Sequence, residues 1–161
     1  MPLFAGKTPL IVEIKTDGGN AAAVTSAACC VLDRFPVTYC IESFDPRALI
    51  WLRKNRPEIC RGQLSCDFRH EPVRLSRPLK WALTHLLANF LTRPDFIAYR
   101  FEDRAMPALR RCRRKYGVQE VSWTIRSRQD LDAAEADGCI VIFEGFIPRG
   151  IKLRTEKEDT L

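Results

Sequence analysis

The sequence predicts an α/β fold of the incomplete (βα)8 TIM-barrel type, with about six βα units, parallel strands and outer helices. Short β-branched segments alternate with longer, helix-like segments along almost all of the 161 residues. Helices of crossover length between successive strands imply a parallel sheet. An open doubly wound sheet has the same alternation, so it is the competing architecture.

The positions of the polar residues favour the barrel. Polar or aromatic side chains lie at or near the ends of most predicted strands, namely Glu13, Lys15, Glu42, Arg100, Glu102, Trp123 and Glu144. A barrel places its function at the carboxyl ends of several strands, whereas an open sheet binds ligands mainly at one crevice. The sequence also lacks a GxGxxG or GxxxxGK[ST] loop, which would support a nucleotide-binding open sheet.

The first two βα units have clear boundaries. PLIVEIK at 9–15 predicts a strand, because it is β-branched and lies between a proline and the Gly-rich turn DGG. The Ala-rich segment 19–35 predicts a helix, and VTYCIESF at 37–44 predicts a second strand. The helix expected at 45–58 begins with Asp45 as its N-cap and a proline at its first helical position.

The middle of the chain continues the alternation. CRGQLSCDF at 60–68 is a weaker strand pattern, and a polar stretch follows it. LKWALTHLLANFL at 79–91 is the strongest helical pattern in the chain. DFIAYRF at 95–101 predicts a strand, and the basic segment MPALRRCRRKYG at 106–117 predicts a helix that a glycine ends.

The C-terminal part supplies the last unit. QEVSWTIR at 119–126 predicts a strand, SRQDLDAAEADG at 127–138 a helix with a serine cap, and CIVIFEGF at 139–146 the last strand. We therefore expect one partial barrel domain at 1–148, followed by a charged tail at 149–161.

Composition indicates a globular protein with free thiols. Hydrophobic residues make up 46% of the chain, and 26 basic against 20 acidic residues give a net charge of +6, which suits an anionic ligand. The seven cysteines form no CxxC pair and no Cys/His cluster with zinc spacing, so we expect free, buried thiols in a reducing compartment. No apolar run reaches the roughly 20 residues of a membrane span, and no signal peptide is expected, so the predicted location is cytoplasmic.

Glu13 and Lys15 are the first candidate site residues. Their i, i+2 spacing places both side chains on one face of a strand. Inside a barrel mouth, Glu13 would be an oxygen ligand for Ca²⁺ or Mg²⁺, and Lys15 would neutralise a phosphodiester oxygen. The alternative is an edge strand with one solvated face.

Several strand ends, in this order, resemble the glycerophosphodiester phosphodiesterase family. PLIVEIKTD resembles its third strand, IESFDPRALIWLRKNRPEI its fourth strand and helix, VSWTIRSRQDLDAAEADG its seventh strand and helix, and CIVIFEGFIP the end of its eighth. The resemblance implies a (βα)8 barrel that hydrolyses a glycerophosphodiester to glycerol 3-phosphate and an alcohol with a divalent metal ion. It also implies a metal-ligand role for Glu13, a phosphate contact for Lys15 and a pocket wall for Trp123.

The first two strands of the family barrel have no counterpart in the sequence. Family members begin with a His-Arg-Gly strand and a Glu-Asn-Thr turn, and a further acidic pair and a second histidine follow. These segments supply the two catalytic histidines and most of the metal ligands. The two histidines here, His70 and His85, lie in other contexts, so no catalytic residue is predicted. The chain is therefore expected to be a truncated or split phosphodiesterase. The alternative is an inactive remnant that acts as an interaction module, with a second chain or a second copy pairing at its open sheet edges.

The remaining candidates have simpler alternative explanations. Trp123 could be core packing, and Arg100, Glu102 and Glu144 could form salt bridges at the rim. His85 is expected to pack on a helix near Trp81 and His70 to be solvated. The basic run RRCRRKYG at 110–117 suits the C-terminal end of a helix dipole, so nucleic-acid binding is not expected.

Overall fold

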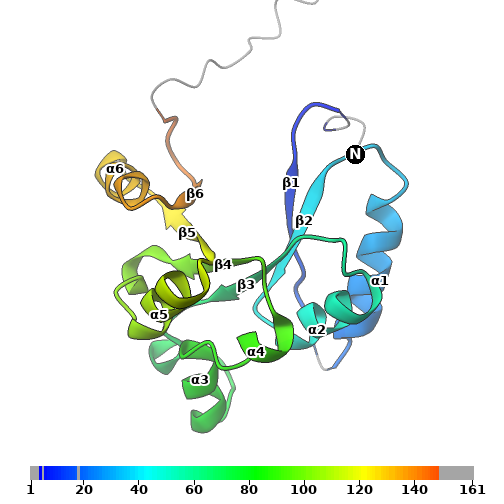
Figure 1. The fold of residues 1–161 in the computed structure, drawn as a ribbon, viewed down its shortest axis with the longest axis horizontal. Helices are drawn as coiled ribbons and strands as arrows, with labels where there is room; N and C mark the ends of the chain where they lie inside the picture. The colour runs from blue at the N-terminus through cyan, green and yellow to red at the C-terminus, as the bar shows by residue number, and fades with distance from the viewer. Residues whose placement is uncertain (1–3, 5, 18, 149–161) are drawn as a thin grey trace, which may run out of the picture.

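The fold is a curved sheet of parallel strands with helices along its outer side (Figure 1). The computed structural model of the chain describes residue 4, residues 6–17 and residues 19–148. Within them, six strands pair in chain order, from β1 at one edge to β6 at the other. The predicted incomplete α/β barrel is confirmed. The tail expected at 149–161 lies outside the described residues.

The strands follow the predicted order with shorter bounds, and so do the helices except the one predicted at 79–91, which is replaced by two. The strands are β1 (Leu10–Glu13), β2 (Tyr39–Ser43), β3 (Arg61–Ser65), β4 (Phe96–Arg100), β5 (Gln119–Ile125) and β6 (Ile140–Phe143). The α-helices are α1 (Ala21–Leu32), α2 (Pro46–Asn55), α3 (Arg77–Thr84), α4 (Asn89–Thr92), α5 (Pro107–Tyr116) and α6 (Arg128–Ala136). Short 3-10 turns follow β3 at Phe68–His70 and β4 at Phe101–Asp103.

The expected capping residues begin and end these helices. The Asp45 side chain accepts a hydrogen bond from the backbone N–H of Arg47 at 2.9 Å, and Ser127 Oγ accepts one from the N–H of Asp130 at 3.1 Å. Gly117 ends α5 with a positive φ of 62°, a conformation that glycine adopts without steric cost. Local sequence therefore determines where these three helices begin or end.

The strongest helical pattern, at 79–91, does not form one helix. It is divided into α3 and α4, because Leu86 takes a left-handed backbone conformation with φ at 57°. Leu86 is buried against β4 and α5, packing with Ile97, Tyr99 and Leu109. Burial of this leucine in the core thus overrides the continuous helical pattern.

The sheet has two different faces. On its outer side, buried apolar residues pack beneath the helices, as with Ile14, Ile41 and Leu49 in the N-terminal part. We call the opposite, concave side the lumen face. It carries alternate residues of successive strands, comprising Glu13, Cys40, Glu42, Leu64, Phe96, Ala98, Arg100, Val121, Trp123 and Ile142.

All seven cysteines are free thiols, as expected, but Cys30 and Cys60 are exposed and not buried. No helix in the described part of the chain is long and apolar enough to cross a membrane.

Gly62 is required by the packing of the lumen face. It lies beside Phe96 in the register of β3 and β4. A Cβ at position 62 would overlap the Phe96 ring, so the aromatic side chain occupies the space that the glycine leaves free. Phe96 is in turn buried against Leu64, Ala98 and Val121 on this face.

We predict that Gly62→Ala lowers the free energy of unfolding by about 1–3 kcal/mol, the usual cost of overpacking a core. The cost should fall when Phe96→Leu is also present, because the smaller side chain vacates the space beside position 62. Urea unfolding of the wild type, both single variants and the double variant measures this coupling. Equal costs of Gly62→Ala in both backgrounds would contradict the packing described.

Candidate functional site

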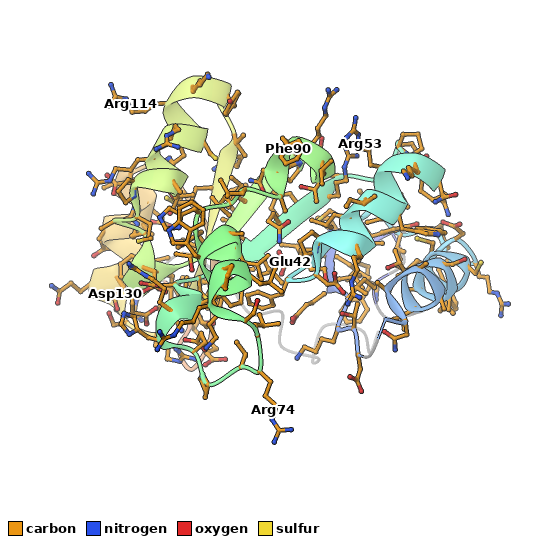
Figure 2. All side chains as sticks on the ribbon, turned by 90° about the horizontal axis from the view of Figure 1, so that it is seen from below. Glu42, Arg53, Arg74, Phe90, Arg114 and Asp130 are labelled. Atoms are coloured by element: carbon orange, nitrogen blue, oxygen red, sulfur yellow. The ribbon has the colours of Figure 1, made fainter. Side chains whose placement is uncertain are left out.

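Two glutamates lie side by side near the carboxyl ends of the first two strands. Glu13 ends β1, and Glu42 is its direct partner in the parallel register with β2. Neighbouring strands lie about 4.8 Å apart, and residues in register share a face of the sheet, so both side chains lie on the lumen face. Glu42 lies in the middle of the molecule, whereas Arg53, Arg74 and Arg114 project from its surface (Figure 2).

Glu42 is a buried carboxylate without a hydrogen-bonding partner. It is only 5% exposed, and its Oε2 atom is buried and accepts no hydrogen bond from the described residues. Burial, and secondarily the nearby charge of Glu13, raises the pKa of Glu42 to about 7. This side chain can therefore either hold a proton near neutral pH or accept a positively charged ligand.

Lys15 lies next to Glu13 and points into solvent. Its Nζ is 3.7 Å from Glu13 Oε2, and its side chain is 83% exposed against 33% for Glu13. Between them, Ile14 is buried in the outer core and donates its backbone N–H to Glu42 O at 2.8 Å. The structure thus brings Glu13 and Lys15 together on one face, as their spacing predicts. An exposed pair of this kind is weak, so Lys15 is free to contact an anion.

Trp123 forms an aromatic wall on the opposite part of the lumen face. Its ring packs edge-on against Phe44 with centroids 5.6 Å apart, and Phe44 packs in the same way on Phe68 at 5.9 Å. The indole Nε1–H is buried and makes no hydrogen bond with a described residue. Trp123 thus combines core packing with a donor that a ligand could use.

A cavity of about 390 Å³ lies next to Trp123 at the strand ends. It is lined by Arg100, Glu102, Asp103, Trp123, Thr124 and Arg126. Trp123 therefore has the position of a pocket wall.

The charged residues around this cavity are largely paired with one another. Arg100 donates to Glu71 and Asp103 at 2.6 Å each, and Arg126 donates to Glu144 at 2.7 Å. Rim salt bridges therefore account for Arg100 and Glu144, the simpler of the two explanations given by the sequence. Glu102 lines the cavity.

Neither histidine lies on the lumen face. His85 stacks on Trp81 with centroids 4.5 Å apart, and its Nδ1 is 2.8 Å from the Trp81 carbonyl oxygen. His70 follows β3 in a 3-10 turn, where its side chain is 80% exposed. The expected packed position of His85 and solvated position of His70 are both confirmed, and neither can serve as a general acid or base beside Glu13.

The metal-binding capacity of this face is limited to the carboxylate pair. Within the described ranges, no group of three or more His, Cys, Asp or Glu side chains is placed to hold a metal ion. Ca²⁺ takes 6–8 oxygen ligands, which two carboxylates cannot supply. Mg²⁺ keeps several waters and binds through one or two carboxylates, so the unpartnered Glu42 oxygen beside Glu13 fits Mg²⁺ better.

The sequence did not identify the pairing of Glu42 with Glu13. Glu42 is visible there as a polar residue near a strand end, but its neighbour depends on the register of β1 and β2. The Ser43-Phe44-Asp45 segment after Glu42 is the sequence feature that bears on this register. Ser43 Oγ donates to Ile14 O at 2.7 Å, and Thr16 Oγ1 donates to Asp45 Oδ2 at 2.7 Å, which together fix the ends of the two strands.

Comparison with known proteins gives matches to solved structures alone. No family model matches the sequence, and no curated protein matches it. A phosphodiesterase of Oleispira antarctica, solved with the product sn-glycerol-3-phosphate, superposes with a TM-score of 0.61 at 17% identity. It covers 84% of this chain, and the chain covers 51% of it.

A second solved structure has the same partial overlap. A glycerophosphodiester phosphodiesterase of Parabacteroides distasonis superposes with a TM-score of 0.59 at 12% identity, over 84% of this chain and 52% of its own. The chain thus spans about half the length of these proteins. Together with the six parallel strands, these matches show that the chain has a partial glycerophosphodiester phosphodiesterase-like fold.

Proposed function

We propose that this chain is the phosphodiester-binding part of a metal-dependent glycerophosphodiester phosphodiesterase of glycerophospholipid metabolism, acting in the cytoplasm. The reaction would yield glycerol 3-phosphate and an alcohol. One observation carries the proposal. Glu13 and Trp123 lie on the lumen face and Lys15 pairs with Glu13, near the carboxyl ends of strands in a fold shared with phosphodiesterases.

The chemistry of each residue suits a phosphodiester ligand. The exposed ammonium group of Lys15 would contact a phosphoryl oxygen, and Glu13 would be one oxygen ligand of the divalent ion. Trp123 would form an apolar wall for the glycerol moiety, with its unpaired N–H available to a hydroxyl group. A bound divalent ion would supply charge stabilisation at the phosphoryl group.

Neither histidine of the chain lies on the lumen face, where a histidine acting as the general acid of hydrolysis would have to lie. His85 is stacked on the outer helix α3, and His70 is solvated in the turn after β3. A general acid must lie within hydrogen-bonding reach of the leaving oxygen. We therefore propose that binding belongs to this chain and that the acid and base come from additional polypeptide.

The proposal predicts that the chain binds glycerol 3-phosphate through Lys15, even in EDTA. Lys15→Met should weaken binding about fivefold, because one exposed charge contact contributes about 1 kcal/mol. Lys54→Met is the matched control, since Lys54 is an exposed lysine at the end of α2, away from the lumen face. NMR titration with glycerol 3-phosphate measures both affinities.

Equal affinity of the wild type and Lys15→Met would contradict the assigned role of Lys15. The same samples, given glycerophosphocholine with Mg²⁺ or Ca²⁺, should release no choline. Robust turnover by this chain would show that the acid and base are present after all.

A second candidate function is self-association or pairing with another chain at the sheet edges. β1 and β6 are the outer strands of the sheet, and each carries an exposed lumen-side isoleucine. Ile11 is 47% exposed and Ile140 54% exposed. Unpaired parallel edges with exposed apolar side chains favour strand addition.

This candidate predicts concentration-dependent association of the purified chain. Ile11→Lys and Ile140→Lys should each shift the equilibrium towards monomer, because a charge on an edge strand opposes pairing. Sedimentation velocity over a range of concentrations measures the shift. If the wild-type chain stayed monomeric at all concentrations, self-association would be contradicted as a function.

A further inference from the structure

We infer that Glu42 is a second carboxylate ligand and that the Glu13–Glu42 pair forms a water-completed Mg²⁺ site on the lumen face. This inference rests on the proposed function and deepens it, because it assigns a metal-binding role to a residue that the sequence left as one of several polar strand ends. It depends on three properties of Glu42, namely its register, its burial and its lack of a partner.

The register of β1 and β2 places the two glutamates next to each other. Glu13 and Glu42 are direct partners across β1 and β2. Their relative position is fixed by the hydrogen bonds from Ile14 N to Glu42 O at 2.8 Å and from Ser43 Oγ to Ile14 O at 2.7 Å. Both side chains therefore extend from adjacent strands onto the same face, which is the arrangement that a shared cation requires.

The buried carboxylate of Glu42 would be stabilised by a positively charged partner. Glu42 is 5% exposed, its Oε2 atom is buried, and no ion pair with it exists in the part of the chain described. Isolated buried carboxylates are strongly disfavoured, so such groups are paired, protonated or bound to a metal ion. The adjacent Lys15 does not fill this role, since it points into solvent beside Glu13.

The exposure of Glu13 allows water to complete the coordination. The Glu13 side chain is 33% exposed, so a cation held between the two glutamates would keep contact with solvent. Mg²⁺ prefers this combination of one or two carboxylates with several waters. The buried oxygen of Glu42 and the open side of Glu13 together match that ion better than one that needs a full protein cage.

The test is metal binding by the purified chain, without substrate or turnover. Mn²⁺ serves as the probe, because the free ion is quantified by electron paramagnetic resonance, and Mg²⁺ is added as the competitor. The variants are Glu13→Gln, Glu42→Gln and, as the matched control, Glu135→Gln. Glu135 is an exposed glutamate on α6, far from β1 in the sheet order.

We expect the wild type and Glu135→Gln to bind one Mn²⁺ that Mg²⁺ displaces. Glu13→Gln and Glu42→Gln should each weaken binding at least about tenfold, because each removes one of two ligands. Thermal unfolding in EDTA checks that both variants are folded, and added Mg²⁺ should stabilise the wild type more than Glu42→Gln.

Two results would overturn the inference. If Glu42→Gln bound Mn²⁺ as tightly as the wild type while Glu13→Gln did not bind it, Glu42 would not be a ligand. Absence of Mn²⁺ binding by the folded wild type at millimolar concentration would remove the site. Neither result touches the binding of glycerol 3-phosphate in EDTA, so failure of the metal site and failure of the proposed function are distinguishable.

Discussion

The register between β1 and β2 is the constraint on which the candidate site depends. Ile14 donates to Glu42 O, and Ser43 Oγ returns a hydrogen bond to Ile14 O, so the ends of the two strands cannot slip without breaking both bonds. A shift of one residue would turn Glu13 towards the outer helices and bring Ile14 to the lumen face. The carboxylate pair therefore follows from the same bonds that bury Ile14 beneath α1 and α2.

Much of the rest of the lumen face is apolar. Phe96 lies over Gly62, and Phe44 joins the carboxylate side of the face to Trp123 through edge-on contacts. Glu42 itself is only 5% exposed, and its Oε2 atom has no hydrogen-bonding partner within the described residues. Burying a carboxylate such as that of Glu42 without a positively charged partner lowers the stability of the folded state. In the proposed site, a bound cation would offset that cost.

The sequence predicted the fold well because its signals are local. Alternating segments, the Asp45 and Ser127 caps and the glycine that ends α5 all reappear in the structure. The prediction of one helix at 79–91 was wrong, because Leu86 is buried against β4 and α5 and interrupts the helical pattern. For the site, the i, i+2 spacing placed Glu13 and Lys15 together. The partnership of Glu13 with Glu42 depends on contacts between residues 29 positions apart, and periodicity within one segment carries no information about them.

The central claim is that Glu42 is buried beside Glu13 without a neutralising partner, and the pH dependence of stability tests it most directly. The pKa of Glu42 is raised from 4.5 to about 7 in the folded chain, so the folded state holds this proton more tightly than the unfolded state. Its contribution to stability is complete below pH 4.5 and is lost as the pH rises to about 7. Urea unfolding in EDTA should therefore show the wild type losing stability over this range relative to Glu42→Gln, which cannot titrate. Parallel pH profiles for the two proteins would contradict the account.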